Sequence, residues 1–496
     1  MNLLSLLWLM LGGLLSAFSF SSRWTIPLAA WLAPLCLLHF VRTQAPLPGL
    51  IGVWLVSFLA LYVSQRDVIP VPGMLYPAIT AGMATLALLP YLADRLLAPR
   101  LPGFAGLFIF PLVWTIAEFS NARFNPFGSW GSVAYTQYGN LPLMQLAAVT
   151  GIWGITFLIA WFAAVVNWAW DNAFIWASIR TEVLVYAAVW SLVMLLGGFR
   201  LAFAPDPPTV RVAGIGLPEG VLEMSERMHT YDPALPDSER RQVSQRLMPL
   251  QTRLLAESQR EAQAGAKIVV WHETAAPVFL EDEPALIERG QQLVREEGIY
   301  LLMGLGTIHK GGVPRIENKA VLLTPAGEVA FAYRKNRPLP GEEALLVIRG
   351  DGKIGFQDTP YGRIAVAICS DLDYPFPPLI RQVSQTRADL FLVPASDWAG
   401  IKHLHPQQAA FRAIENGVAV VRPARWGISM SFDAYGRVLA SQDHFTTNER
   451  VLVAQVPTQG VQTIYGRVSD LFAWLCVVAL TLGVVAMRGS IFSGKG

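Results

Sequence analysis

The stretch Gly362-Arg-Ile-Ala-Val-Ala-Ile-Cys369 decides how this sequence is interpreted, because it joins a strand-like run to a reactive group. Its mostly apolar residues predict a strand of a sheet that is covered on its faces. A polar turn, Ser370-Asp-Leu-Asp373, follows directly. A thiol at the end of a buried strand and at the start of a loop is held rigidly and stays reachable. We therefore expect Cys369 to be a nucleophile.

Two further segments carry the remaining parts of such a site. Glu273 ends a second strand-like run, Lys267-Ile-Val-Val-Trp-His-Glu273, and Lys335 lies in Tyr333-Arg-Lys-Asn-Arg-Pro-Leu-Pro-Gly-Glu342. A thiol attacks a carbonyl as the thiolate, so a carboxylate can take its proton and an ammonium can stabilise the oxyanion that follows. A plainer interpretation, a buried thiol and a surface Glu–Lys pair, fits the spacing equally well.

The composition predicts a membrane protein with a soluble insert. The chain has 496 residues, of which 53% are hydrophobic and 15% charged, and its mean hydropathy is +0.40. These values are too apolar for an ordinary soluble protein. Because charges are sparse at both ends, we expect a membrane domain over 1–204, a soluble domain over 205–465, and a closing membrane helix with a short tail over 466–496. The net charge of +2 and the lack of a basic stripe give no reason to expect nucleic-acid binding.

Hydrophobic segments near the length of a membrane crossing predict about eight transmembrane helices. They cover 3–20, 24–41, 49–64, 73–93, 103–120, 141–170, 182–199 and 469–487. No basic region precedes the first segment and a second follows it at once, which favours a multispan protein over a signal peptide. The bias of basic residues in the short loops favours a cytoplasmic N-terminus, with the soluble domain on the outer face.

The soluble domain alternates strand-like and helix-like segments. Apolar runs predict strands at 210–216, 267–273, 299–304, 319–324, 362–369 and 389–394, and amphipathic patterns predict helices at 238–265 and 283–298. This order indicates an α/β domain, a layered α-β-β-α sandwich with helices outside.

The remaining cysteines and a histidine pair do not predict further sites. Cys36 and Cys476 lie in apolar runs, where a thiol behaves as a small buried hydrophobe. Three cysteines cannot form a disulfide framework. His403 and His405 lie in a proline-flanked loop without an evident third ligand, so we expect no metal site.

The sequences around the three candidate residues resemble the three motifs of the nitrilase (carbon–nitrogen hydrolase) superfamily. The matching stretches are Val270-Trp-His-Glu-Thr-Ala-Ala-Pro277, Tyr333 to Glu342, Ala367-Ile-Cys-Ser-Asp371, and Val393-Pro-Ala-Ser-Asp-Trp398 after the nucleophile. By this resemblance, Glu273 is the general base, Lys335 the oxyanion stabiliser and Cys369 the nucleophile. The resemblance also implies supporting or substrate-binding roles for Glu342, Asp371 and Trp398.

A nitrilase-like domain between seven hydrophobic segments and an eighth is similar to the apolipoprotein N-acyltransferase family. Trp114, Glu118, Arg123 and the stretch Asn125-Pro-Phe-Gly-Ser-Trp130 resemble the corresponding part of its membrane half. The resemblance implies transfer of an acyl chain from a phospholipid, through a cysteine thioester, to the amine of a diacylglyceryl-cysteine lipoprotein. It calls for no metal or nucleotide cofactor. It further implies a monomer in the bacterial cytoplasmic (inner) membrane, with its catalytic domain on the periplasmic face.

The sequence departs from the family pattern at two places. Ser370-Asp371 stands where the family has Tyr-Glu, and the loop after Lys335 is one residue shorter. Glu342 or Glu343 then supplies the second carboxylate, and we expect Glu342 because a glycine precedes it. These departures leave open a membrane-tethered amidase, an acyltransferase for another amine, or a non-catalytic binding module. They do not alter the expected fold.

Overall fold

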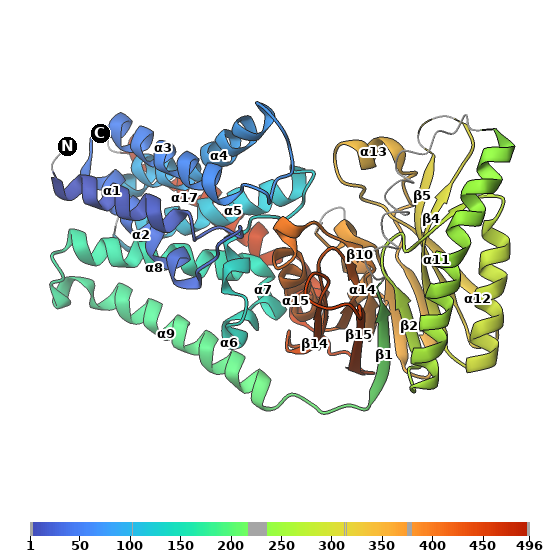
Figure 1. The fold of residues 1–496 in the computed structure, drawn as a ribbon. Helices are drawn as coiled ribbons and strands as arrows, with labels where there is room; N and C mark the ends of the chain where they lie inside the picture. Colours follow the sequence, from blue (N-terminus) through green and yellow to red (C-terminus); the bar gives the residue numbers. More distant parts are fainter. Residues whose placement is uncertain are drawn as a thin grey trace. The chain divides into compact units, whose positions relative to one another are not determined.

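The computed structural model describes residues 3–101, 103–216, 236–311, 313, 315–373 and 379–493. The chain divides into two compact units, whose ribbons are drawn in Figure 1. A helical unit is formed from Met1–Asn125, Ser129–Ala204 and Val468–Gly496. A sheet unit is formed from Pro126–Gly128 and Pro205–Arg467. Each is considered by itself.

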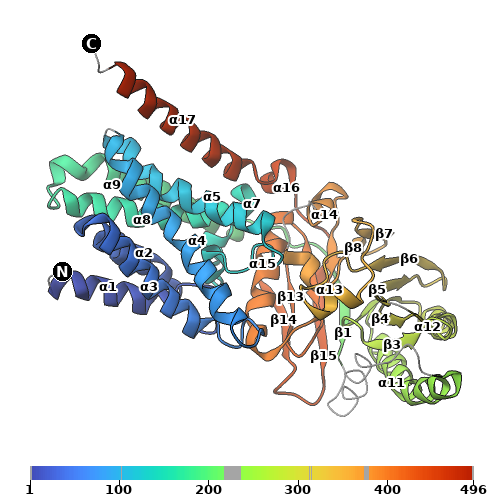
Figure 2. The ribbon, with the colours of Figure 1, turned by 90° about the horizontal axis from the view of Figure 1, so that it is seen from above.

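The helical unit consists of long apolar helices joined by short connections. They are α1 (Leu3–Ser16), α2 (Pro27–Thr43), α3 (Pro46–Ser64), α4 (Leu75–Leu97), α5 (Ile109–Phe124), α8 (Ile152–Asp171), α9 (Trp176–Ala202) and α17 (Leu471–Ser493). Proline stands at the start of α2 and of α3, where its missing N–H costs no helical hydrogen bond. Helix α5 packs against α4, α8 and α17, and Figure 2 shows these helices from above.

Five helical segments among the described residues are long and apolar enough to cross a membrane. They are Pro46–Ser64, Leu75–Arg100, Gly103–Phe124, Ile152–Asp171 and Trp176–Ala202. The segments predicted at 3–20, 24–41 and 469–487 form the shorter apolar helices Leu3–Ser16, Pro27–Thr43 and Leu471–Met487.

The prediction of one continuous span over 141–170 is wrong. The chain there forms two single-turn helices, α6 (Leu141–Met144) and α7 (Ala147–Thr150), before α8 begins at Ile152. Gly151 lies between α7 and α8 with φ of 65° and ψ of −170°, an extended conformation of positive φ that glycine adopts without steric cost.

The sheet unit contains two larger sheets. The first has seven strands in the order β15-β1-β2-β4-β5-β6, with β3 paired to β4. Its strands are β1 (Thr209–Ile215), β2 (Ile268–Trp271), β3 (Ala276–Phe279), β4 (Tyr300–Ile308), β5 (Ile316–Leu323), β6 (Val329–Arg334) and β15 (Val451–Pro457). The central pairs β1–β2 and β2–β4 are parallel, and their strands are almost wholly buried.

The second sheet has six strands in the order β14-β13-β11-β9-β8-β7. They are β7 (Gly355–Thr359), β8 (Gly362–Val366), β9 (Leu390–Leu392), β11 (Ala419–Arg422), β13 (Ile428–Phe432) and β14 (Val438–Asp443). A short parallel pair, β10 (Ala395–Ser396) with β12 (Ala424–Arg425), continues past the ends of β9 and β11.

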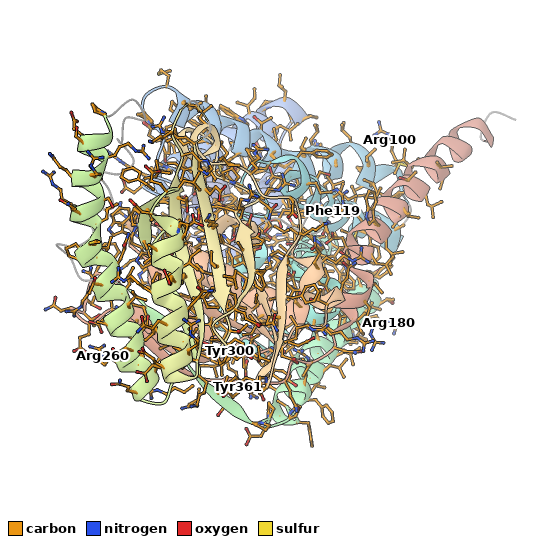
Figure 3. All side chains as sticks on the ribbon, turned by 90° about the vertical axis from the view of Figure 1, so that its right-hand side faces the viewer. Arg100, Phe119, Arg180, Arg260, Tyr300 and Tyr361 are labelled. Atoms are coloured by element: carbon orange, nitrogen blue, oxygen red, sulfur yellow. The ribbon has the colours of Figure 1, made fainter. Side chains whose placement is uncertain are left out.

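Helices cover the outer side of each sheet, as the predicted α-β-β-α sandwich requires. Figure 3 shows α11 (Asp237–Gln263) and α12 (Glu283–Glu297) lying across the first sheet, and α15 (Leu404–Asn416) packs against β11 and β13 of the second. Leucines of α11 and α12 join residues of β2 and β4 in one buried core. At one end of the sandwich, the rings of Tyr300 and Tyr361 meet edge to face at 6.5 Å, which links β4 to the turn between β7 and β8.

Candidate active site

The three predicted catalytic residues all follow the carboxyl end of a strand. Glu273 lies two residues beyond β2, Lys335 follows β6 directly, and Cys369 lies three residues beyond β8. Cys369 opens the 3₁₀ turn η6 (Cys369–Asp373) with φ of 48°, which is unusual for a residue with a side chain. Its N–H donates to the Pro394 carbonyl at 2.9 Å. Such local backbone strain is typical of functional positions held in place by their surroundings.

Glu273 and Lys335 form a buried ion pair. The Lys335 Nζ donates to Glu273 Oε1 at 2.8 Å and to Glu343 Oε1 at 2.6 Å. Asn318 Nδ2 donates to the same Glu273 oxygen at 2.7 Å. The side chains of Glu273, Lys335 and Asn318 are all buried, whereas Glu343 is partly exposed. One ammonium therefore joins two carboxylates from different segments.

This pairing sets the charges of the site. Burial alone would raise the pKa of Glu273, but the nearby Lys335 ammonium and the hydrogen bond from Asn318 outweigh it and lower that pKa. Burial opposes the charge of Lys335, and the Glu273 and Glu343 carboxylates more than compensate, so the pKa of Lys335 lies well above its usual value. Both groups are therefore ionised at neutral pH.

The Cys369 thiol is held neutral in this resting arrangement. It is buried and its Sγ donates to the Ser396 carbonyl at 3.5 Å. Burial and then the Glu273 carboxylate raise the pKa of the thiol well above its usual value, although Lys335 acts in the opposite direction. The neutral thiol must lose its proton to become a nucleophile. The ionised carboxylate of Glu273 can accept that proton.

Asp371 fastens two parts of the site together. Its carboxylate accepts hydrogen bonds from Tyr333 Oη at 2.6 Å, Arg337 N at 2.7 Å, Asn336 N at 3.1 Å and Ile368 N at 3.2 Å. The residues after Lys335 and the residue before Cys369 are thus tied to one side chain. Burial raises the pKa of Asp371 to about 6, although Tyr333 and Lys335 oppose the shift.

Two glutamates, Glu342 and Glu343, follow Lys335, and the structure describes the side chain of Glu343. The side chain of Glu342, the residue preferred from the sequence, lies outside the described part of the chain. Glu343 contacts Lys335, and its second oxygen accepts the Leu339 N–H at 2.8 Å. Glu343 is the second residue of helix α13 (Glu342–Leu346).

Trp398 lies in the same segment as Ser396, whose carbonyl accepts the hydrogen bond from the Cys369 thiol. It stands two residues after Ser396, in an extended conformation, and is half-buried. Sequence reasoning missed Asn318 and Tyr333 as partners of the site. Asn318 lies within a strand and gives no signal of its own, whereas Tyr333 belongs to the motif that contains Lys335.

One group of potential metal ligands lies among the described residues. Atoms of Cys369, Asp397 and His405 lie within 4.8 Å of one another. Arg422 donates to both oxygens of Asp397, at 2.6 and 3.1 Å. A guanidinium on that carboxylate already supplies the positive charge that a metal ion would bring, so we assign no metal to this group.

Glu118 of the helical unit contacts neutral groups of α5, α8 and the loop that follows α5. It accepts hydrogen bonds from Trp114 Nε1 at 3.1 Å, Ser132 Oγ at 2.6 Å, Val133 N at 2.9 Å and Thr156 Oγ1 at 2.7 Å. The Arg123 guanidinium lies over the rings of Phe119 and Trp474, at 5.2 and 5.4 Å. These contacts tie α5 to α8 and to the following loop.

A glutamate, a lysine and a cysteine at strand ends of a two-sheet α/β sandwich define a carbon–nitrogen hydrolase domain, and the profile of that family matches residues 241–465. The profile of the apolipoprotein N-acyltransferase N-terminal domain matches residues 12–165. The chain belongs to the apolipoprotein N-acyltransferase family and is a multi-pass membrane protein.

Full-length relatives carry the same name. The apolipoprotein N-acyltransferase of Geobacter metallireducens is 29% identical over 90% of this chain and 83% of its own length. That of Azotobacter vinelandii is 26% identical over 83% and 80%. Among solved structures, an amidase from Nesterenkonia sp. aligns with 52% of this chain and 94% of its own, at 19% identity and a TM-score of 0.40.

Proposed function

We propose that this apolipoprotein N-acyltransferase takes its acyl chain from a phospholipid and passes it, through a thioester on Cys369, to the N-terminal amine of diacylglyceryl-cysteine lipoproteins. The observation that carries the proposal is the buried ion pair of Glu273 and Lys335 beside a strained cysteine. These residues can supply the nucleophile, the base and the oxyanion stabiliser of acyl transfer by a thiol. The membrane helices of the same chain bring it to the bilayer, where both lipid substrates reside.

The first half-reaction forms the thioester. Glu273 accepts the proton of the Cys369 thiol as Sγ attacks the carbonyl carbon of the phospholipid ester. The Lys335 ammonium stabilises the oxyanion of the tetrahedral intermediate. The bond to the glycerol oxygen then breaks, and the protonated Glu273 returns its proton to that oxygen, so a lysophospholipid leaves and Cys369 carries the acyl chain.

The second half-reaction uses the same groups in the opposite direction. The lipoprotein amine attacks the thioester carbonyl while Glu273 accepts one of its protons. Lys335 again stabilises the oxyanion, and Sγ leaves as a thiol after it regains the proton from Glu273. The product is an amide, and the enzyme returns to its starting state with no net gain or loss of protons.

Burial of the site favours the amine over water in that second step. Glu273, Lys335 and Cys369 are all nearly inaccessible, and the apolar segment Ala276–Phe279 after Glu273 is buried too. Excluding water protects a thioester from hydrolysis. We also propose that the protein is a monomer in the bacterial cytoplasmic membrane, with the sheet unit on the periplasmic face. The charge bias of the short loops supports that orientation.

A thioester-trapping experiment tests the proposal. Purified protein in detergent is incubated with alkyne-labelled phosphatidylethanolamine and compared with the Cys369→Ala variant. We expect hydroxylamine-sensitive label on the native protein alone. Absence of label on folded protein, with Cys369 reactive to small thiol reagents, would overturn the phospholipid donor and favour an amidase or another substrate.

A further inference from the structure

A second buried charge cluster lies beside the nucleophile, and the two half-reactions above do not use it. It comprises Asp373, Asp397, His405 and Arg422, whose exposed fractions are 5%, 3%, 2% and 0%. The Cys369 Sγ and one atom each of Asp397 and His405 lie within 4.8 Å of one another. Four charged or chargeable groups so deeply buried are costly unless they are paired.

His405 bridges the two segments that hold the sulfur. Its Nδ1 lies 2.7 Å from Asp397 Oδ1, and its Nε2 lies 3.4 Å from Asp373 Oδ2. Asp373 is the last residue of the turn that begins at Cys369. Asp397 directly follows Ser396, whose carbonyl accepts the hydrogen bond from the Cys369 thiol. One imidazole therefore connects the nucleophile turn to the acceptor of the thiol hydrogen.

The protons on the His405 ring decide whether it can bind both aspartates. Arg422 Nη2 lies 2.7 Å from His405 Nδ1 and donates to Asp397 Oδ1 at 2.6 Å, so three polar atoms meet at one point. The imidazolium carries a proton on each ring nitrogen, so Nδ1 donates to Asp397 while Nε2 is a second donor that faces Asp373. A neutral ring keeps only one of these protons and can donate to one carboxylate but not to both. The bridge between the two aspartates therefore requires the protonated ring.

Building on the function proposed above, we propose that His405 is a positioning residue for Cys369. Its protonated ring holds the nucleophile turn against the Ser396 segment, and loss of the proton releases that hold. The charged groups that face the ring are Asp373 on the turn, Asp397 after β10, and Arg422 at the end of β11, with the Cys369 thiol close by.

The charges around the ring favour its protonated form. Burial and Arg422 both act to lower the pKa of His405, but the Asp373 and Asp397 carboxylates outweigh them and raise it above the ordinary value. The bridge is then fully formed at acidic pH and is lost as pH rises through the raised pKa. Positioning of Cys369 should weaken over that same range.

The test compares His405, in the first turn of α15, with His403, the residue just before that helix, in the full-length protein. His405→Asn places an amide near the position of Nδ1, which keeps a donor to Asp397 but removes the charge and the reach to Asp373. His405→Gln provides a second variant of different reach. His403→Asn is the matched control, because His403 is exposed and lies two residues away. Alkylation of Cys369 by iodoacetamide is followed by peptide mass spectrometry from acidic to alkaline pH, which separates it from Cys36 and Cys476.

We expect the wild-type alkylation profile to show the ionisation of the thiol and a second step from His405. The second step should vanish in both His405 variants and persist in His403→Asn. Thioester formation from phospholipid should fall about 10- to 100-fold in the His405 variants, the range for loss of one buried charged hydrogen bond at a reacting group. Thermal unfolding shows whether each variant is folded.

The outcomes separate this inference from the proposed function. Folded His405 variants with the wild-type profile would overturn the positioning role. If the variants do not fold, the wild-type profile alone decides, because a single ionisation contradicts the proposal. A changed profile in His405→Asn, together with no lipid label on the native protein, would uphold the positioning role and reject the phospholipid donor.

Discussion

Two glutamates, one in each unit, show how differently a protein can satisfy a carboxylate. Glu118 in the helical unit receives two hydrogen bonds on each oxygen, all from neutral donors. Glu273 in the sheet unit receives an ammonium and an amide on one oxygen, and a thiol lies beside it. Both carboxylates are well bonded, so the number of hydrogen bonds does not distinguish them.

The two sets of partners differ in charge and in whether a partner can give a proton to the carboxylate. Trp114, Ser132, Val133 and Thr156 give Glu118 no ionised partner, and together they fix a loop and two helices. Lys335 keeps Glu273 ionised, and the thiol beside it carries a proton that Glu273 can take. We therefore regard the Glu118 group as structural and the Glu273 group as reactive, and substitutions that preserve shape but remove charge test that distinction.

The largest effect is expected for Glu273→Gln. The amide keeps the shape and the hydrogen bond to Asn318, but it cannot take the thiol proton, so thioester formation should fall by about 10²- to 10⁴-fold. The rate of labelling with alkyne phospholipid measures this. Thermal unfolding is the control for an intact fold. A folded variant that retains the native rate would remove Glu273 from the reaction.

Lys335→Met should lower the rate by about 10²- to 10³-fold, because the oxyanion loses its cation. It should also move the acidic limb of the pH–rate profile. Lys335 lowers the pKa of Glu273, so without it Glu273 becomes protonated at a higher pH, and activity is lost earlier on acidification.

Lys319→Met is the matched control for that substitution. Lys319 is another buried lysine, and its Nζ lies 2.7 Å from carboxylate oxygens of Glu283 and of Glu317. Its loss should cost stability without moving the acidic limb. An identical limb in wild type and Lys335→Met would show that the ammonium does not set the protonation of Glu273.

Many strands of the fold were predictable from the sequence, because apolar runs that end at polar residues mark where buried strands end. The strands before Glu273 and Cys369 are marked in this way, and the helices over the first sheet have regular apolar spacing. The break at Gly151 was not predictable, because the residues around it are mostly apolar and one glycine with positive φ leaves no pattern. The structure also shows strand β4 continuing to Ile308, beyond the predicted end at 304.

The partners of the candidate site were harder to predict than its location. Asn318 and His405 meet the site from a strand and a helix that are distant in sequence, so only the paired sheets bring them there. Glu342 was preferred from the sequence, and the contact that the structure describes is that of Glu343 with Lys335. Motifs identify groups that react, whereas the groups that orient them come from packing.

Tyr333→Phe should destabilise the sheet unit by about 1–3 kcal/mol, because Asp371 loses its shortest hydrogen bond in a buried place. The pKa of Asp371, about 6, lies above its usual value, so its stabilising contribution is present at acidic pH and is lost as pH rises through about 6. The bond from the Tyr333 hydroxyl acts in the opposite direction, because it lowers that pKa and so favours the ionised carboxylate. Loss of the hydroxyl should cost most above pH 6, where Asp371 is ionised.

Thermal unfolding at two pH values measures that difference. Tyr361→Phe is the control, since its ring contact with Tyr300 is kept. An equal loss of stability at both pH values would show that the Tyr333 hydroxyl does not depend on the charge of Asp371.

The smallest effect is expected for Glu118→Gln. Its amide oxygen can keep the bonds from Trp114 and Val133, and its amide nitrogen can donate to the hydroxyls of Ser132 and Thr156, which are able to accept. The free energy of unfolding should then change by less than about 1 kcal/mol, whereas Glu118→Leu, which leaves the donors unmatched, should cost about 3 kcal/mol or more.

Thermal unfolding in detergent and the labelling rate with alkyne phospholipid measure both variants of Glu118. A structural carboxylate predicts a native labelling rate for the Gln variant and a parallel loss of stability and rate for the Leu variant. If Glu118→Gln instead remained stable and lost activity as Glu273→Gln does, the charge of Glu118 would matter to the reaction. Two carboxylates with unlike partners would then share one function, and the contrast between neutral and charged partners would no longer separate structural from reactive groups.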